Sequence, residues 1–230
     1  MSEGLARLGI GVAESPSEKS AQQSTIAPSI SGRALGLDND ALILFTSGTT
    51  GAPKGVVHTH RSLLARWAAL QQRLGTRAFR HTLCALPTHF GHGLICNALY
   101  PWLTGQDLHV LPPFRSDVLI QLGAIVDSYD VTFLSSVPAM WRLILRASRP
   151  PRSGSLERVF CGSAPLCTQL WTDIQGWAGT RDVWNVYGMT ETASWMTGSS
   201  GAEVDPEDGL VGDPWGGVVR VVDFDATPDH

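Results

Sequence analysis

Cysteine is scarce in this chain of 230 residues, and no two cysteines have a metal-binding spacing. The four present, Cys84, Cys96, Cys161 and Cys167, lie in or beside apolar segments and form no C-x-x-C pair. This spacing argues against a zinc site and against a disulfide framework. We expect buried thiols in a protein of a reducing compartment.

Long apolar runs and a strong charge of one sign are also missing. No segment approaches the roughly 18 apolar residues of a membrane span, and the first residues, Met1 to Val12, lack the apolar core of a secretory signal. The net charge is −4, with both signs mixed along the chain, so there is no concentrated basic face for nucleic acid. We expect a soluble cytoplasmic protein that binds neither nucleic acid nor a membrane.

What the chain does have is a stretch rich in glycine and hydroxyl groups, F-T-S-G-T-T-G-A-P-K-G, from Phe45 to Gly55. Glycines let the backbone approach an anion closely, the hydroxyls donate hydrogen bonds, and Lys54 adds a cation. Apolar residues precede and follow it, so we expect it to join two strands. The residues expected to contact phosphate are Thr46, Ser47, Gly48, Thr49, Thr50, Gly51 and Lys54.

This stretch has two other possible interpretations. A Walker A loop requires G-x-x-x-x-G-K-[ST], but Pro53 stands where the second glycine belongs and Gly55 where the Ser or Thr belongs. A P-loop phosphotransferase is therefore disfavoured. Taken alone, a Gly/Ser/Thr/Pro run is also typical of a solvated loop.

Beyond the stretch, predicted helices and strands alternate. The expected helices are 63–74, 94–103, 116–129, 138–147 and 165–177, and the expected strands are 41–45, 82–86, 107–111, 131–135, 158–162, 183–187 and 218–224. Because parallel strands need crossover connections, which are usually helical, we expect an α/β fold with a mainly parallel sheet and helices on both faces. Ligands of such sheets bind beyond the carboxyl ends of the strands.

Composition divides the chain into three parts. Residues 1–34 are expected to be a flexible lead-in, since 14–31 are rich in Ser, Gln, Pro and Ala. Residues 35–196 are expected to form the folded core that carries the phosphate-binding stretch, and 197–230 the start of a further β subdomain. The large side chains expected in the core are Trp102, Met140, Trp141, Trp184 and Trp195.

Two further motifs follow expected strands. The string N-V-Y-G-M-T-E, Asn185 to Glu191, combines an aromatic ring, a glycine, a hydroxyl and a carboxylate. Alone, it is also explained as a capped helix start. The string C-G-S-A-P-L, Cys161 to Leu166, is explained alone as a strand-to-helix turn with Pro165 at the first helical position.

Together, T-S-G-T-T-G-x-P-K-G, N-x-Y-G-x-T-E and G-[GAS]-A-P-L resemble the signatures of the adenylate-forming superfamily, which contains acyl-CoA synthetases, luciferases and the adenylation domains of peptide synthetases. The resemblance implies that Tyr187 stacks on adenine, Thr190 touches the α-phosphate and Glu191 ligates magnesium. It implies Lys54, Thr190 and Glu191 as the catalytic residues. The remaining residues that it implies for the nucleotide site are Gly162, Ser163, Ala164, Pro165, Asn185, Val186 and Gly188, the small ones leaving room for a flat purine.

The segment L-P-T-H-F-G-H-G, Leu86 to Gly93, resembles the family's gate to the acyl pocket. Its spacing places the gate at Phe90, with His89 as the alternative. A metal site made by the histidines of this region and of the phosphate-loop region is disfavoured, because no Cys or acidic ligand has a matching spacing. Ordinary loop and surface histidines are expected instead: His58, His60, His89 and His92.

The resemblance implies ATP-dependent activation of a carboxylic acid as acyl-AMP, followed by transfer to CoA or another thiol, with ATP, Mg²⁺ and CoA as cofactors and co-substrate. Met189 in Y-G-M-T-E favours acyl-CoA synthetases, and thus a role in fatty acid metabolism, over a peptide-synthetase-type adenylation domain. The family's ribose-binding aspartate, hinge and catalytic lysine, which lie beyond the last expected strand, are not found here. We therefore expect an incomplete acid–thiol ligase completed by a separate C-terminal domain or partner chain. A split enzyme or a non-catalytic nucleotide-binding remnant stays open.

Overall fold

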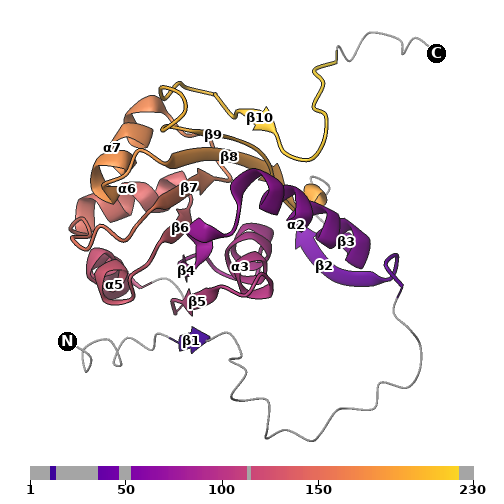
Figure 1. Ribbon diagram of the computed structural model, residues 1–230, viewed down its shortest axis with the longest axis horizontal. Helices are drawn as coiled ribbons and strands as arrows, with labels where there is room; N and C mark the ends of the chain where they lie inside the picture. The colour runs from indigo at the N-terminus through magenta and orange to yellow at the C-terminus, as the bar shows by residue number, and fades with distance from the viewer. Residues whose placement is uncertain (1–10, 14–35, 47–52, 113–114, 223–230) are drawn as a thin grey trace, which may run out of the picture.

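The computed structural model describes residues 11–13, 36–46, 53–112 and 115–222. An eight-stranded sheet of order β1-β5-β4-β6-β7-β8-β9-β10 runs through its centre (Figure 1). The strands are β1 (Gly11–Ala13), β4 (His81–Cys84), β5 (Asp107–Val110), β6 (Phe133–Ser136), β7 (Arg158–Gly162), β8 (Val183–Met189), β9 (Ser194–Ser200) and β10 (Asp213–Pro214). Strands β5, β4, β6, β7 and β8 are parallel, and β1, β9 and β10 are antiparallel additions at the edges. The predicted mainly parallel sheet is confirmed.

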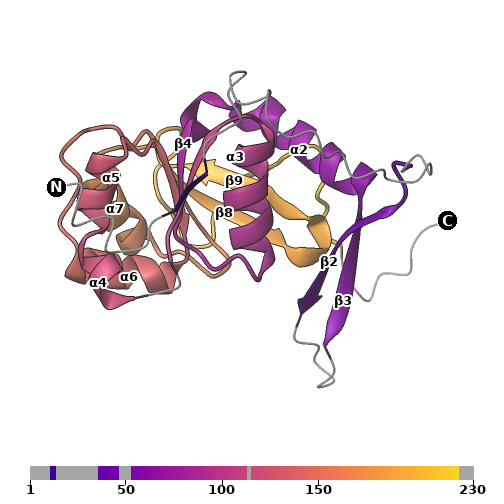
Figure 2. The ribbon, with the colours of Figure 1, turned by 90° about the horizontal axis from the view of Figure 1, so that it is seen from below.

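Helices cover both faces of the sheet, as predicted (Figure 2). One face carries α2 (His60–Leu74), the short turn η2 (Arg77–Phe79), the π-helical segment η3 (His92–Leu99) and α3 (Tyr100–Leu103). The other carries α4 (Ser116–Ile120), α5 (Leu122–Ser128), α6 (Pro138–Ala147) and α7 (Thr168–Ala178). The longest helix of the described ranges, α2, has 15 residues, and no described helix is both long and apolar enough to cross a bilayer.

Successive side chains of the central strands point to opposite faces of the sheet and pack in two separate hydrophobic cores. On β7, Val159 and Cys161 pack under α6 and α7, whereas Phe160 points to the opposite face. There Phe160 meets an aromatic cluster, with ring centroids 4.8 Å from Trp195 and 5.7 Å from Trp184. Edge-to-face and tilted ring pairs of this kind stabilise a core beyond the area that they bury.

Four of the five large side chains expected in the core lie there. Trp141, Trp184 and Trp195 are buried, and Met140 packs partly buried against the α6 and α7 side. Trp102 is the exception, since 45% of its surface is exposed at the end of α3. The prediction for Trp102 was wrong because an apolar residue type does not fix which side of a short helix it occupies.

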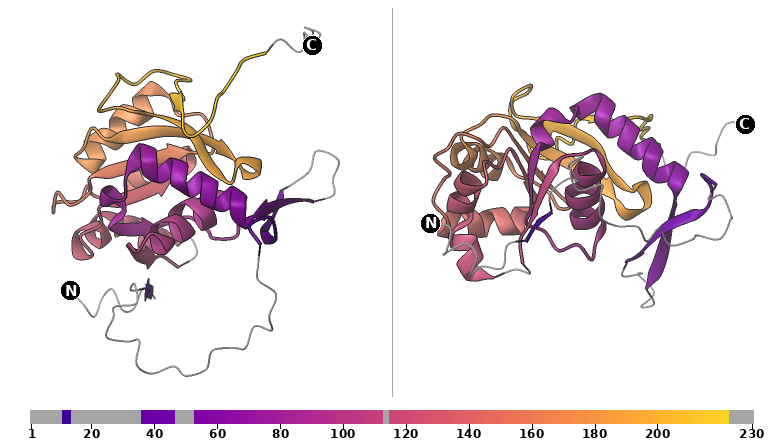
Figure 3. Two further views of the ribbon diagram at one scale, coloured as in Figure 1. Left: turned by 45° about the vertical axis from the view of Figure 1, so that its right-hand side comes forward. Right: turned by 60° about the horizontal axis from the view of Figure 1, so that its bottom comes forward.

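A separate hairpin of β2 (Asp40–Thr46) and β3 (Lys54–Thr59) stands beside α2, apart from the main sheet (Figure 3). The strand expected at 41–45 is confirmed, but its partner is antiparallel. α2 follows β3 directly, and the Thr59 side chain caps this helix by accepting a hydrogen bond from the Ser62 N–H at 3.2 Å. Residues 47–52, most of the predicted phosphate loop, lie outside the described residues.

Of the expected helices, only 138–147 has the observed bounds. The helix expected at 116–129 is interrupted at Gln121. The helix expected from Pro165 begins three residues later, at Thr168, where the Asp208 carboxylate accepts hydrogen bonds from the Thr168 N–H and Oγ1 at 2.6 and 2.7 Å. This carboxylate is distant in sequence, so the local position of Pro165 could not reveal the true helix start.

The end of the described chain also differs from expectation. Residues 218–222 form no strand, and Val221 is completely exposed. Their valine-rich pattern lacks a neighbouring strand in the described residues, and strand propensity alone does not form a sheet. Beyond β8 the sheet continues with β9 and ends with β10. β9 was not predicted because its Ser and Gly residues are weak strand formers.

Candidate functional site

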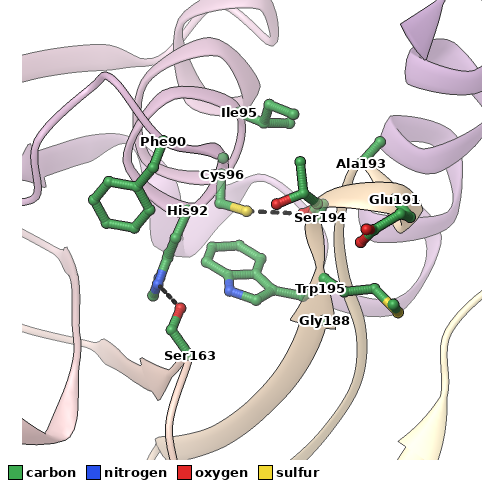
Figure 4. Close-up of a pocket in the computed structure, with 13 residues that line it drawn as sticks. Phe90, His92, Ile95, Cys96, Ser163, Gly188, Glu191, Ala193, Ser194 and Trp195 are labelled. Carbon is green, nitrogen blue, oxygen red and sulfur yellow. Dashed lines mark hydrogen bonds between the residues drawn. The ribbon is translucent and has the colours of Figure 1, made fainter. Parts of the chain in front are cut away.

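A cavity of about 360 Å³ lies beyond the carboxyl ends of β7 and β8, where η3 and β9 approach them (Figure 4). Five of the predicted site residues line it together: Phe90, Ser163, Gly188, Thr190 and Glu191. They come from all three motifs that follow strands of the main sheet. The expected position of a ligand in such a sheet therefore coincides with a real cavity.

The short turn η4 (Thr190–Thr192) presents the two polar residues of the second motif. The Thr192 side chain holds this turn, accepting from the Met189 N–H at 3.2 Å and contacting the Met189 and Ser194 carbonyls at 2.9 Å. Within the described ranges, the side chains of Thr190 and Glu191 take part in no hydrogen bond. Because the Thr192 side chain makes the hydrogen bonds that hold the backbone of this turn, the side chains of Thr190 and Glu191 remain available to a ligand.

Other predicted nucleotide-binding residues do not line the cavity. Asn185 and Val186 are buried within β8, and the Asn185 side chain donates to the Leu210 carbonyl at 2.7 Å. Tyr187 lies on the surface with 47% of its area exposed. Two more predicted residues, Ala164 and Pro165, are exposed in the turn after β7.

Packing between strands explains why glycine is required at positions 162 and 188 of the two motifs. A Cβ on Gly162 would lie 2.6 Å from the Val186 carbonyl oxygen, and one on Gly188 would lie 2.3 Å from the Ser194 carbonyl oxygen. Such distances are below any normal contact, so both glycines allow neighbouring strands to approach. The small size of Gly162 is thus accounted for by β7 and β8 themselves, without a purine.

The predicted cation is not among the residues that line the cavity. Lys54 is exposed at the start of β3, opposite Thr46, whereas the β3 residue beside η4 is His58, near the other end of the strand. Neither Thr46 nor Lys54 borders the cavity. The remaining members of the loop, Ser47, Gly48, Thr49, Thr50 and Gly51, lie outside the described residues, so a shared phosphate site stays a prediction.

Of the two gate candidates, Phe90 lines the cavity and His89 is exposed without lining it. Two histidines expected on the surface or in loops are in fact buried, His58 at 2% and His92 at 8% exposure. Burial lowers the pKa of His58, partly offset by the Thr190 backbone and the Glu191 charge. His58 therefore borders the turn that carries Glu191 and keeps its ring mainly uncharged.

Eight lining residues were not among the predicted site residues: Gly91, His92, Ile95, Cys96, Met189, Ala193, Ser194 and Trp195. The rings of Phe90, His92 and Trp195 gather on one side of the cavity, and Glu191 lies on the other (Figure 4). The His92 ring meets Trp195 edge to face at 5.6 Å and Phe90 at 6.4 Å. The cavity thus has an aromatic side and an anionic side.

Two lining residues have a left-handed backbone that is unusual for residues other than glycine. Ser163 has φ of 66° and Ala193 has φ of 62°. Each such residue costs on the order of 1 kcal/mol, and residues of this kind concentrate at functional sites. Two such residues line this one cavity, which indicates that the cavity is functional. This indication does not depend on the sequence motifs.

The thiols behave as predicted. Cys84, Cys96 and Cys161 are buried and Cys167 is partly buried, and none of the four forms a disulfide. Burial raises the pKa of Cys96 to about 12, and the Ser194 hydroxyl lies 3.0 Å from its sulfur. Cys96 therefore presents an uncharged wall to the cavity.

Magnesium fits this site as an ion shared with phosphate. No three His, Cys, Asp or Glu side chains of the described residues are grouped closely enough to hold a metal by themselves. Mg²⁺ needs only one or two protein carboxylates when phosphate oxygens and waters complete its shell. The exposed Glu191 carboxylate, free of hydrogen bonds to described residues, provides one.

Burial of His92 predicts a specific pH dependence of stability. Burial lowers the pKa of His92 to about 4 from 6.5. Between these values the unfolded chain binds a proton that the folded chain does not, so the free energy of unfolding falls as the pH falls through this window. By pH 4 the loss reaches about 3 kcal/mol.

Urea unfolding at pH 7, 6 and 5 checks this prediction. The wild type should lose more stability over this range than His92→Asn, which has no imidazole to protonate. Parallel pH dependences of the two proteins would contradict it.

The mainly parallel sheet and the cavity beyond its carboxyl ends define an α/β domain of the kind that binds nucleotides at this edge. A family model described as AMP-binding enzyme matches residues 8–229. The chain belongs to the AMP-binding enzyme family.

Relatives of this chain are CoA ligases. A probable CoA ligase of Humulus lupulus, CCL8, is 34% identical over 209 residues, which cover 80% of this chain and 33% of the relative. ATP-bound MatB from Rhodopseudomonas palustris has a TM-score of 0.62 at 29% identity, covering 78% of this chain and 35% of MatB. MenE from Bacillus subtilis, in complex with ATP and magnesium ion, has a TM-score of 0.64 at 28% identity, covering 79% of this chain and 37% of MenE. The chain spans about a third of the length of the curated relatives that it matches.

Proposed function

We propose that this chain is the nucleotide-binding core of an acid–thiol ligase, which activates a carboxylic acid as acyl-AMP and transfers the acyl group to CoA. The observation that carries the proposal is the single cavity on which Thr190, Glu191, Ser163 and Phe90 open. These residues come from segments up to a hundred positions apart. Motifs that matched by chance would not be expected to line the same cavity.

The anionic side of the cavity suits the nucleotide. Glu191 would hold Mg²⁺ together with phosphate oxygens, which neutralises the charge of the leaving pyrophosphate. The Thr190 hydroxyl would donate to an α-phosphate oxygen, and the exposed Tyr187 ring offers a face to adenine. Lys54, on the hairpin, would reach the outer phosphates once the nucleotide is bound.

The aromatic side suits the acid. Phe90, Ile95 and Trp195 form an apolar wall next to Ser163 and Thr190, so a compact acid can place its tail against the rings and its carboxylate toward the α-phosphorus. Holding both reactants in this orientation is the main contribution that a protein makes to such a transfer. Exclusion of water by the apolar wall would protect the activated acid.

Pyrophosphate exchange over a panel of compact carboxylic acids tests the proposal. The chain is assayed alone and with an added C-terminal domain from a related CoA ligase, because it spans about a third of its relatives' length. We expect ATP-dependent exchange that the added domain increases. No exchange in either arm, with any acid, would reject the catalytic proposal.

Calorimetry with ATP and Mg²⁺ separates the proposal from a non-catalytic nucleotide-binding chain. Binding accompanied by exchange supports the ligase, and binding without exchange supports the alternative. Formation of ADP instead of AMP would indicate phosphotransfer and contradict both.

A further inference from the structure

The His92 imidazole joins two serine hydroxyls from different strands. Its Nδ1 lies 2.8 Å from Ser163 Oγ, in the turn after β7, and its Nε2 lies 2.8 Å from Ser135 Oγ, on β6 (Figure 4 shows the first contact). His92 is 8% exposed and Ser135 is fully buried, while Ser163 is exposed toward the cavity. A three-residue polar chain therefore runs from the core to the cavity wall.

The proton positions in this chain follow from the need to satisfy buried donors. A neutral imidazole has one N–H and one acceptor nitrogen, and burial keeps His92 neutral by lowering its pKa to about 4. Among the described residues, the Ser135 side chain has His92 Nε2 as its hydrogen-bond partner. A buried O–H without an acceptor is costly, so Ser135 donates to Nε2 and the ring proton lies on Nδ1.

This assignment fixes the role of Ser163. The Nδ1–H donates to Ser163 Oγ, which leaves the Ser163 O–H free to donate into the cavity. Ser163 needs such support, because its φ of 66° is unfavourable for a residue with a side chain. Neither the turn after β7 nor the cavity supplies another described partner for its hydroxyl.

We propose that His92 is a positioning residue, present as the Nδ1–H tautomer, that holds the Ser163 hydroxyl as a hydrogen-bond donor to an oxygen of the bound nucleotide. This rests on the proposed function, since it takes the cavity ligand to be a nucleotide. His92 touches Ser163 and acts through it. It also connects the aromatic side of the cavity with the turn after β7.

Asparagine and glutamine at position 92 separate positioning from packing. The Asn amide lies where Nδ1 lies and can donate to Ser163, whereas the Gln amide reaches the Nε2 position and Ser135. The variants are His92→Asn, His92→Gln, Ser163→Ala and the double variant His92→Gln/Ser163→Ala. The measurement is the dissociation constant of ATP with Mg²⁺, with urea unfolding as a check that each variant folds.

We expect Ser163→Ala and His92→Gln each to weaken ATP binding about tenfold, a typical effect of one hydrogen bond to a charged group. The double variant should bind ATP no more weakly than either single variant. The dissociation constant of His92→Asn should stay within about twofold of the wild-type value. Wild-type affinity in Ser163→Ala, or equal losses in His92→Asn and His92→Gln, would overturn the proposal.

Nitrogen-15 NMR of the wild type without nucleotide tests the tautomer directly. A protonated Nδ1 and an unprotonated Nε2 at pH 7 are expected, and the reverse would overturn the chain of hydrogen bonds. This result does not depend on the reaction. If the wild type fails to bind ATP, the proposed function fails, whereas the tautomer still reports on His92 alone.

Discussion

Glu191→Gln is expected to lower the rate of pyrophosphate exchange about a hundredfold or more, and to weaken binding of ATP with Mg²⁺. Removing one fixed charge or donor that stabilises developing charge typically costs this much in a preorganised site. The substitution keeps the shape of the side chain and removes only its charge. Because the Glu191 side chain is exposed and bonded to no described residue, the free energy of unfolding should not change.

Glu207→Gln is the matched control for this experiment. Glu207 is an exposed carboxylate outside the cavity, in the segment before β10, so the same chemical change there should leave exchange and ATP affinity at wild-type values. Exchange assays in varied Mg²⁺ add a second readout, because Glu191→Gln should require more magnesium for half-maximal rate. Equal rates in the wild type and Glu191→Gln would remove Glu191 from the mechanism.

Gly93→Ala is expected to destabilise the fold by about 4 kcal/mol or more, one of the largest effects available from a single methyl group. Gly93 is buried in η3, and an added Cβ would lie 1.9 Å from the Pro87 carbonyl oxygen and 2.7 Å from its carbon. Both contacts are with backbone, so no side-chain rotation can relieve them. Either η3 or the gate segment must move, and both carry the wall of the cavity.

The control is Gly176→Ala in α7, where nothing lies within 4 Å of the added Cβ. There the methyl group should stabilise by about 0.5–1 kcal/mol, since alanine is the better helix former. Urea unfolding of both variants against the wild type provides the measurement. A loss below about 1 kcal/mol for Gly93→Ala would mean that the backbone at Pro87 yields easily.

Local motifs were sufficient to predict one half of the site. Thr190, Glu191 and Ser163 follow directly after the strands β8 and β7, so their positions at the carboxyl edge were predictable once the alternating pattern indicated a parallel sheet. Phe90, which follows β4, was predicted from the spacing of the segment that resembles the family's gate. In each case, sequence neighbours define the geometry, and a short string carries the information.

The other half of the site is formed by contacts between segments that are distant in the sequence. Ser194 and Trp195 reach the cavity because β9 turns back antiparallel along β8, with an irregular register at Tyr187 and Gly188. His92 is the first residue of η3, which begins earlier than the helix expected at 94–103, and Cys96 reaches the cavity from the same element. A polar ring and a serine-rich strand carry no local signal of burial, so their places were set by packing that the pattern could not show.

Some of the predicted residues also have a role in packing. Gly162 and Gly188 belong to motifs associated with nucleotides, yet their small size is required by the contacts of β7 with β8 and of β8 with β9. Asn185 is likewise occupied by the Leu210 carbonyl. Such residues support the site by shaping the backbone around it, and substitutions there should change stability before they change affinity.

The protonated Cys96 has a consequence for the proposed activation of an acid. An acyl-AMP is an electrophile, and a thiolate beside it would capture the acyl group as a dead-end thioester on the protein. Nucleophilic attack requires the thiolate form, which a pKa of about 12 makes vanishingly rare at neutral pH. The cavity can therefore include sulfur in its wall and still leave the acyl group for an external thiol.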